Sequence, residues 1–170
     1  GRRNADSGDS GVSGRVYGMM AERMSDSRKR GRILWALATS RPDLVEVDLK
    51  RPGRVDVKIP IFPTATPEEG YQLLRALAKR RGVELDQNLP EEFRKTIPDL
   101  LTPGAAEALS VKLYRSLKTG AANANAALTA ALRDYQPPVP VAVIQEQIAL
   151  AVAEATDLGF VPERFRTPAR

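Results

Sequence analysis

Two short apolar runs, joined by a loop rich in arginine and proline, constrain the fold more than any other feature of the chain. The first run, 33–38, is apolar on both faces and is closed by polar residues, which is typical of a strand buried in a parallel sheet. The second run, 55–61, has an apolar residue at every other position and predicts a strand with one face inward. Pro60 places this strand at a sheet edge or near its own end. The two runs predict the end of an α/β sheet.

After residue 63 the apolar residues change from a strand period to a helix period. Thr66, Pro67 and Glu69 form a capping box with proline at the first helical position, so a helix starts here. Further helices are predicted over about 90–97, 103–119 and 125–135, and four helices with short connections make a small bundle. Another short helix is predicted before the first apolar run, over about 14–25, and one more after the proline-rich break at 137–140. The chain is therefore predicted to be an α/β piece followed by helices.

The composition excludes several classes of site. Histidine and cysteine are both absent, which excludes Ser-His-Asp triads, thiolate nucleophiles, disulfides and metal sites built on His or Cys. The formal charge of +5 gives a mildly basic surface that permits a nucleic acid or acidic partner without requiring one. No apolar run approaches the ~20 residues of a transmembrane helix, and no signal peptide is visible. We expect a cytoplasmic protein with no membrane span.

The loop between the two predicted strands carries a long motif. It reads ATSRPD from residue 38, then LVEVD, then LKRPGRVD up to residue 56. This stretch resembles, without a gap, the second region of homology of the AAA family of ATPases, which lies between two strands. One position departs from the family pattern, because Ser40 stands where the family usually has a sensor asparagine.

The resemblance implies roles for two arginines. In the family, both arginines of R-P-G-R lie at a subunit boundary and face the ATP of the neighbouring subunit, so Arg51 and Arg54 are expected to be trans-acting arginine fingers. Arginine suits this role because its planar, permanently charged fork matches phosphate oxygens. The alternative interpretation is that both are surface arginines paired with Asp48 or Asp56.

The resemblance also implies polar and small residues that contact the nucleotide. Ser40 is expected to act as sensor 1, orienting the attacking water, with Thr39 assisting or replacing it; the alternative is a loop serine that caps the next turn. Gly104 and Ala105 lie where the family has a lid motif whose small residues let the backbone approach adenine. The usual acid of that motif is missing, because Ala106 replaces it, and small residues at a helix start are common for packing alone.

The phosphate-binding motif of such ATPases, G-x-x-x-x-G-K-[ST], does not occur in the sequence, nor does a strand ending in paired acids that could hold Mg²⁺. We therefore interpret residues 1–63 as the C-terminal portion of an AAA+ α/β core, 64–138 as the helical lid and 139–170 as a C-terminal helical extension. The extension either docks on the lid or serves a partner. ATP and Mg²⁺ are expected as cofactors of the intact protein, which would work as a homo-oligomeric ring, expected to be a hexamer. This chain alone is expected to be inactive.

A hypothesis from a different class is a non-catalytic, basic helical module that binds a polyanion or a protein partner. Its cations would come from Arg28–Lys29–Arg30–Gly31–Arg32 and from Lys79–Arg80–Arg81. The lack of aromatic residues interleaved with these cations for base stacking weakens this hypothesis. The client of an ATPase of this kind is not encoded in these residues.

Overall fold

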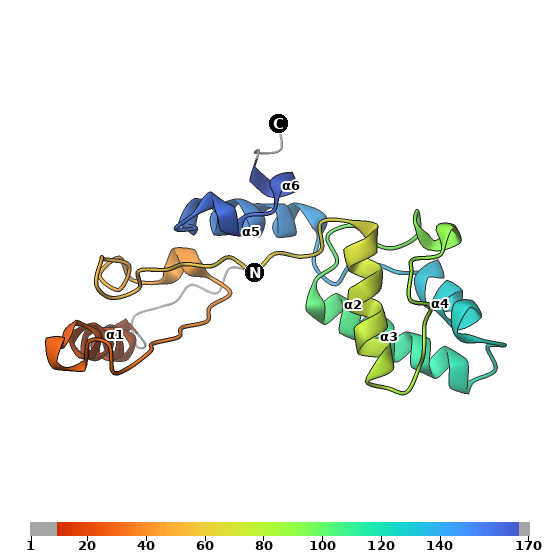
Figure 1. The fold of residues 1–170 in the computed structure, drawn as a ribbon, viewed down its shortest axis with the longest axis horizontal. Coiled ribbons are helices and arrows are strands. Elements are labelled where there is room, and N and C mark those ends of the chain that lie inside the picture. Colours follow the sequence, from red (N-terminus) through yellow and green to blue (C-terminus); the bar gives the residue numbers. More distant parts are fainter. Residues whose placement is uncertain (1–9, 167–170) are drawn as a thin grey trace. The chain divides into compact units, whose positions relative to one another are not determined.

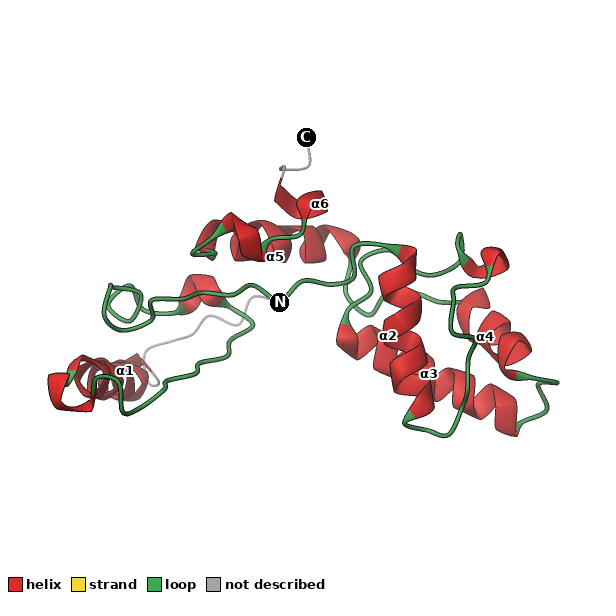
Figure 2. Cartoon of the chain, viewed as in Figure 1, coloured by secondary structure: helices red, strands yellow, loops and turns green. Residues whose placement is uncertain are grey.

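The computed structural model describes residues 10–166, and the regular structure of that part of the chain is entirely helical (Figure 1, Figure 2). The α-helices are α1 (Ser10–Ser25), α2 (Pro67–Lys79), α3 (Pro103–Lys118), α4 (Ala124–Arg133), α5 (Val141–Glu154) and α6 (Glu163–Arg166). Short 3₁₀ helices are η1 (Ser27–Lys29), η2 (Pro42–Leu44), η3 (Glu91–Phe93) and η4 (Leu158–Phe160). None of the helices in the described residues is long and apolar enough to cross a membrane.

The chain forms two compact units. The first unit contains the described residues up to Pro60 together with Leu150–Val161, and the second contains Ile61–Ala149 together with the described residues from Pro162 onward. The last residues of α5 therefore belong to the first unit, and the earlier ones to the second. The segment boundaries expected from the sequence, at residues 63 and 138, stay a prediction.

Helices α2, α3 and α4 of the second unit begin at side-chain caps. Thr66 accepts a hydrogen bond from the Glu69 N–H at 3.2 Å, and the Glu69 carboxylate in return accepts one from the Ala65 N–H at 2.6 Å. Thr102 caps α3 and Asn123 caps α4 in the same manner. These caps satisfy backbone donors that a helix start leaves without an intrahelical partner, and each is worth about 1 kcal/mol.

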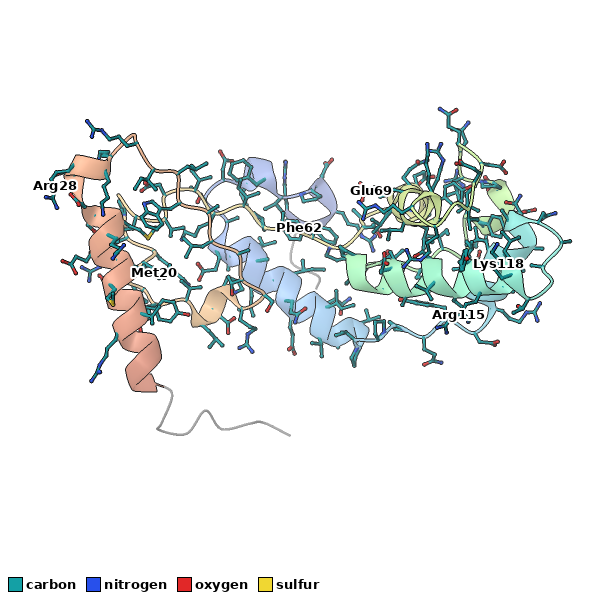
Figure 3. The ribbon with its side chains drawn as sticks, turned by 90° about the horizontal axis from the view of Figure 1, so that it is seen from below. Met20, Arg28, Phe62, Glu69, Arg115 and Lys118 are labelled. Atoms are coloured by element: carbon teal, nitrogen blue, oxygen red, sulfur yellow. The ribbon has the colours of Figure 1, made fainter. Side chains whose placement is uncertain are left out.

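α3 packs against both α2 and α4, as Figure 1 shows, and the three helices enclose one apolar core. The α2 residues Tyr71 and Leu74 are almost fully buried, and so are Leu113 of α3 and Leu128 of α4. Burial of each large apolar side chain contributes about 1.5–3 kcal/mol before the entropy cost of ordering it. Arg115 and Lys118 lie in the last turn of α3 (Figure 3), where cations complement the helix dipole.

The end of the second unit docks through α6. Phe165 is buried and stacks on Phe62, with 5.1 Å between the ring centroids. Arg164 forms a two-pronged ion pair with Asp99, at 2.7 and 2.6 Å, and also donates to the Ala65 carbonyl. The Arg164 hydrogen bonds lower the pKa of the Asp99 carboxyl, and burial opposes this shift in part. The contacts that hold this short helix thus include a ring stack, a charge pair and a hydrogen bond to the Ala65 carbonyl.

The two predicted strands are not formed in the described residues, so the α/β part of the predicted fold class is not confirmed (Figure 2). Residues 33–39 and 56–64 have no regular secondary structure. Most of their apolar side chains are exposed, reaching 94% of full exposure for Leu34 and 82% for Ile61. A strand needs a neighbouring strand to satisfy its backbone N–H and C=O groups, and the described residues supply none.

All but one of the predicted helices are present in the described residues. The helices expected over about 14–25, from Pro67, from Pro103 and over 125–135 are present as α1 to α4, and α5 follows the proline-rich break. The helix expected over 90–97 is reduced to the single turn η3 followed by irregular turns. Phe93 and Ile97 are nevertheless buried, because the turns bring both side chains into the apolar core of the second unit.

Candidate functional site

The arginine loop, residues 49–55, is a closed turn of the first unit. The Val55 N–H donates to the Leu49 carbonyl at 3.2 Å, and Leu49 is buried at the base of the loop. Gly53 has a positive φ of +85°, a conformation that disfavours any residue with a side chain. Its N–H donates to the Asp56 carboxylate at 2.6 Å. Glycine thus makes the turn, and Asp56 holds it.

Arg54 is anchored at both ends of its guanidinium. Nε donates to Ser25 Oγ at 2.8 Å, and Nη1 donates to the Asp48 carbonyl at 2.7 Å while also pairing with the Asp48 carboxylate. Its side chain is only 22% exposed. Ser25 is the last residue of α1, and its hydroxyl donates back to the Ala21 carbonyl at 2.7 Å, so α1 orients the acceptor.

Arg51 projects much further into solvent. Its side chain is 70% exposed, and its charge contact in the described part of the chain is from Nε to Asp48 Oδ1 at 3.4 Å. An exposed pair of this kind is worth no more than about 1 kcal/mol, so it leaves the guanidinium free to exchange partners. Two arginines share the single carboxylate of Asp48, while the Asp56 carboxylate is occupied by Gly53. The loop therefore carries net positive charge.

A further arginine lies beside the turn. Arg30 Nη2 is 3.8 Å from the position that a Cβ on Gly53 would occupy. Its neighbour Arg28 is paired instead with Asp26, at 3.0 Å from both guanidinium nitrogens involved, and these hydrogen bonds lower the pKa of the Asp26 carboxyl. Lys29 also reaches Asp26. Arg30 therefore adds positive charge beside the arginine loop.

Ser40 and Thr39 lie in the first unit, in the extended segment before η2. Thr39 Oγ1 accepts the Arg41 N–H at 3.0 Å, and Arg41 forms a two-pronged ion pair with Asp43 at 2.9 and 2.6 Å, which lowers the pKa of the Asp43 carboxyl. Ser40 is exposed at the bend. Within residues 10–166, no hydrogen bond joins Thr39 or Ser40 to the two predicted finger arginines.

Gly104 and Ala105 lie in the second unit, in the first turn of α3. No atom lies within 4 Å of the point where a Cβ on Gly104 would sit, so backbone is accessible there. Ala105 is buried and lines a cavity of about 200 Å³, whose other walls include Thr102, Tyr135 and Ile144. Burial raises the pKa of the Tyr135 hydroxyl. Leu100, which also lines the cavity, has φ at +50°, a strained value for leucine.

The chemistry of these groups suits an anion. Guanidinium forks and accessible backbone N–H groups recognise phosphate oxygens. The described residues contain no group of three or more His, Asp or Glu side chains that could hold a metal ion.

The sequence pattern did not reveal the residues that hold the arginine loop from a distance. Glu154 pairs with Lys50 at 2.6 Å, and Thr156 bonds to the backbone of Asp56 and Lys58. These partners are far apart in sequence. Lys50 and Glu154, for example, are separated by 104 positions. No periodic or motif signal connects positions that far apart.

Comparison with known proteins gives relatives of one kind. The chain is 31% identical over 88 residues to a Dictyostelium discoideum ATPase, nvl, whose name assigns it to ribosome biogenesis. It is 32% identical over 85 residues to the peroxisomal ATPase PEX6 of the same organism, and 34% identical over 83 residues to the peroxisomal ATPase pex1 of Schizosaccharomyces pombe. No family model matches the chain. No solved structure matches it.

These matches cover a limited part of each relative. They include 52%, 50% and 49% of this chain, but only 10%, 7% and 8% of the respective relatives. The chain thus spans about a tenth or less of the length of the curated relatives that it matches.

Proposed function

The chain belongs to the AAA family of ATPases, of which it represents a C-terminal region, and from this premise we propose that it supplies trans-acting arginines to ATP hydrolysis in a ring. The observation that carries the proposal is the geometry of the arginine loop. A glycine turn presents Arg51, 70% exposed, next to Arg54, which is anchored by Ser25 and Asp48.

The two arginines would act on ATP bound to a neighbouring subunit. Phosphoryl transfer depends mainly on position and charge, and an arginine delivered by a neighbour can accelerate it by ~10³–10⁵. Arg54 is pre-oriented, so little entropy is lost when its fork meets phosphate oxygens. Arg51 can exchange its contact with Asp48 for a contact with phosphate, because an exposed ion pair is weak. The ring, expected to be a hexamer, creates the boundary where this contact is made.

Ser40 would orient the attacking water, with Thr39 assisting it. Ser40 is exposed and follows one of the two apolar segments, which supports a role for its hydroxyl at a surface. Thr39 already fixes the bend by accepting the Arg41 N–H. The Mg²⁺ ligands and the phosphate-binding loop would lie on other parts of the full-length protein.

The exposed apolar segments support completion of a sheet by the rest of that protein. Ile33, Trp35 and Leu37 are each at least 38% exposed, and Leu34 is 94% exposed. Apolar surface of this kind marks an interaction site. We assign residues 1–63 to an AAA+ core in which these segments become strands, 64–138 to the lid and 139–170 to an extension.

The lid would contact adenine through the start of α3. Gly104 leaves the backbone accessible, and the apolar cavity beside Ala105 can accept the edge of a planar ring. The alternative function, a polyanion-binding module, has less support. Arg28 and Lys29 share Asp26, and Arg81 pairs with Glu107, so acids of the same chain already neutralise part of each basic cluster.

The experiment that tests the proposal uses Arg54→Ala in the full-length protein. Nucleotide affinity should remain nearly unchanged, because the arginine serves the neighbour, while turnover should fall by orders of magnitude, up to ~10³–10⁵. Arg54→Lys should restore little, since ammonium lacks the planar fork. Arg51→Ala should act in the same direction. Arg23→Ala is the matched control, since it removes an exposed arginine from α1 in the same unit.

Mixed rings test whether the arginine acts in trans. Combining the Arg54→Ala subunit with a second mutant that lacks the lysine of the phosphate-binding loop can place an intact Arg54 beside an intact nucleotide site. Some turnover should therefore return on mixing. Near-normal turnover of Arg54→Ala in an assembled ring, or mixing that never restores any activity, contradicts the proposal.

A further inference from the structure

A segment that follows the second unit returns to the arginine loop. Residues 150–161, named here the C-terminal strap, belong to the first unit although residues 61–149 belong to the second. The strap contains the last residues of α5, the turn at 155–157 and the short helix η4. Its contacts with the rest of the first unit include three hydrogen bonds and two ion pairs, all to residues between positions 50 and 58.

Glu154 connects the strap to two lysines that flank the finger arginines. Its Oε1 lies 2.6 Å from Lys50 Nζ, and its Oε2 lies 3.7 Å from Lys58 Nζ. Lys50 directly precedes Arg51. The Lys50 and Glu154 side chains are only 17% and 26% exposed, so water screens this pair less than an open surface pair. One carboxylate therefore connects two positions on either side of Arg51 and Arg54.

Thr156 holds the backbone that leaves the loop. Its hydroxyl accepts the Lys58 N–H at 2.8 Å and donates to the Asp56 carbonyl at 3.3 Å, while its own N–H donates to the Lys58 carbonyl at 3.2 Å. Asp56 in turn accepts the Gly53 N–H through its carboxylate. A continuous set of contacts thus runs from Thr156 through Asp56 to Gly53, the residue before Arg54.

Apolar packing alone holds this unit weakly. Among the described residues of the first unit, the buried apolar side chains are Ala21, Leu49 and Val161. Leu49 begins the arginine loop and Val161 ends the strap. A loop with so little apolar burial takes its position mainly from polar contacts, which are the ones that Glu154 and Thr156 make.

We propose that Glu154 and Thr156 are positioning residues for the arginine fingers, acting through Lys50 and Asp56 respectively. The inference rests on the proposed function of Arg51 and Arg54. Charge stabilisation in phosphoryl transfer requires the fork to meet the phosphate oxygens in a defined place, and a displacement of about 1 Å can cost about 100-fold in rate. Loss of the strap contacts lowers turnover without removing any group that touches ATP.

The test is a mutant cycle in the full-length protein. Thr156→Val keeps the shape of the side chain and removes the hydroxyl, and Glu154→Gln removes the charge. The double variant Glu154→Gln/Thr156→Val should lower kcat by about ten- to a hundredfold, with nucleotide affinity unchanged. In a background of Arg51→Ala/Arg54→Ala, the same double variant should lower kcat by less than about twofold. The effects of substitutions in residues that act as a unit do not add.

Two variants serve as matched controls. Thr156→Ser retains the hydroxyl and should keep normal turnover. Glu146→Gln removes the same charge from an exposed position of the same helix and should also keep it. The unfolding temperature of each variant shows whether a loss of kcat reflects a loss of folded protein, and Thr156→Val alone gives a milder change if the double variant unfolds.

The outcomes separate this inference from the proposed function. If Arg54→Ala abolishes turnover while Glu154→Gln/Thr156→Val leaves kcat intact in folded rings, the positioning role is wrong and the finger role stands. An equal loss of kcat with and without the two arginines also overturns the positioning role. If Arg54→Ala itself keeps normal turnover, the proposed function is wrong, and this result comes from a different variant than the ones that test the positioning role.

Discussion

At the scale of single residues, glycine decides how closely α2 can approach the rest of the second unit. Gly70 is buried in α2, and a Cβ placed on it would lie 2.7 Å from Ile97 Cγ2. Alanine gains about 1 kcal/mol over glycine in helix propensity, but overpacking of a close contact costs about 1–3 kcal/mol. We expect Gly70→Ala to destabilise the chain, measured by urea unfolding followed by far-ultraviolet circular dichroism.

Gly104→Ala is the control for this prediction, because it makes the same substitution in a helix where no atom lies within 4 Å of the new Cβ. It should leave stability unchanged or raise it. Ile97→Ala removes the opposing methyl group, so Gly70→Ala should cost less in that background than alone. A stabilising effect of Gly70→Ala on the unmutated background contradicts the close contact.

At the scale of elements, α6 makes a pH-dependent contribution to stability through Asp99. The Arg164 hydrogen bonds lower the folded pKa of this carboxyl below its ordinary value of 3.8. A group whose pKa is lower in the folded state stabilises the fold above its unfolded pKa and loses that contribution as the pH falls through the folded pKa. The Asp99 side chain is 65% exposed and that of Arg164 is 41% exposed, which limits the contribution to no more than about 1 kcal/mol.

The measurement is the free energy of unfolding of the wild type minus that of Asp99→Asn. This difference should be constant above about pH 5 and shrink as the pH falls below about 4. Asp134→Asn removes an exposed aspartate at the end of α4 and is the control for the loss of one surface carboxylate. A difference that stays the same down to acid pH means that the charge pair does not hold α6.

Elements also show how much could be predicted from the sequence. The helices that begin at Pro67 and Pro103 are both predicted from the sequence, and each follows a capping threonine, because capping chemistry is local in sequence. The segments 33–38 and 55–61 have the pattern of strands, yet strand formation depends on partners that the described residues lack. The sequence predicts roles for Arg51 and Arg54, but it gives no signal for Ser25 or Glu154, which contact the arginine loop through tertiary structure.

At the scale of the whole molecule, the exposed apolar segments separate the isolated chain from the full-length protein. Leu34 is 94% exposed here, so Leu34→Asp should not change the unfolding temperature of the 170-residue chain. If residues 33–38 form a buried strand in the full-length protein, as proposed, the same substitution places a charge in an apolar interior. It should then destabilise that protein by about 2–7 kcal/mol.

Val47→Asp controls for the introduced charge, because Val47 is 75% exposed in a turn that is not proposed to join a sheet. It should leave both the chain and the full-length protein unchanged. Each variant changes the same atoms in both proteins, so any difference in its effect comes from the surroundings of the residue in the chain and in the full-length protein. Equal tolerance of Leu34→Asp in the two proteins would mean that the segment stays solvated and that the sheet is not completed through it. A loss confined to the full-length protein supports the assignment of residues 1–63 to an ATPase core.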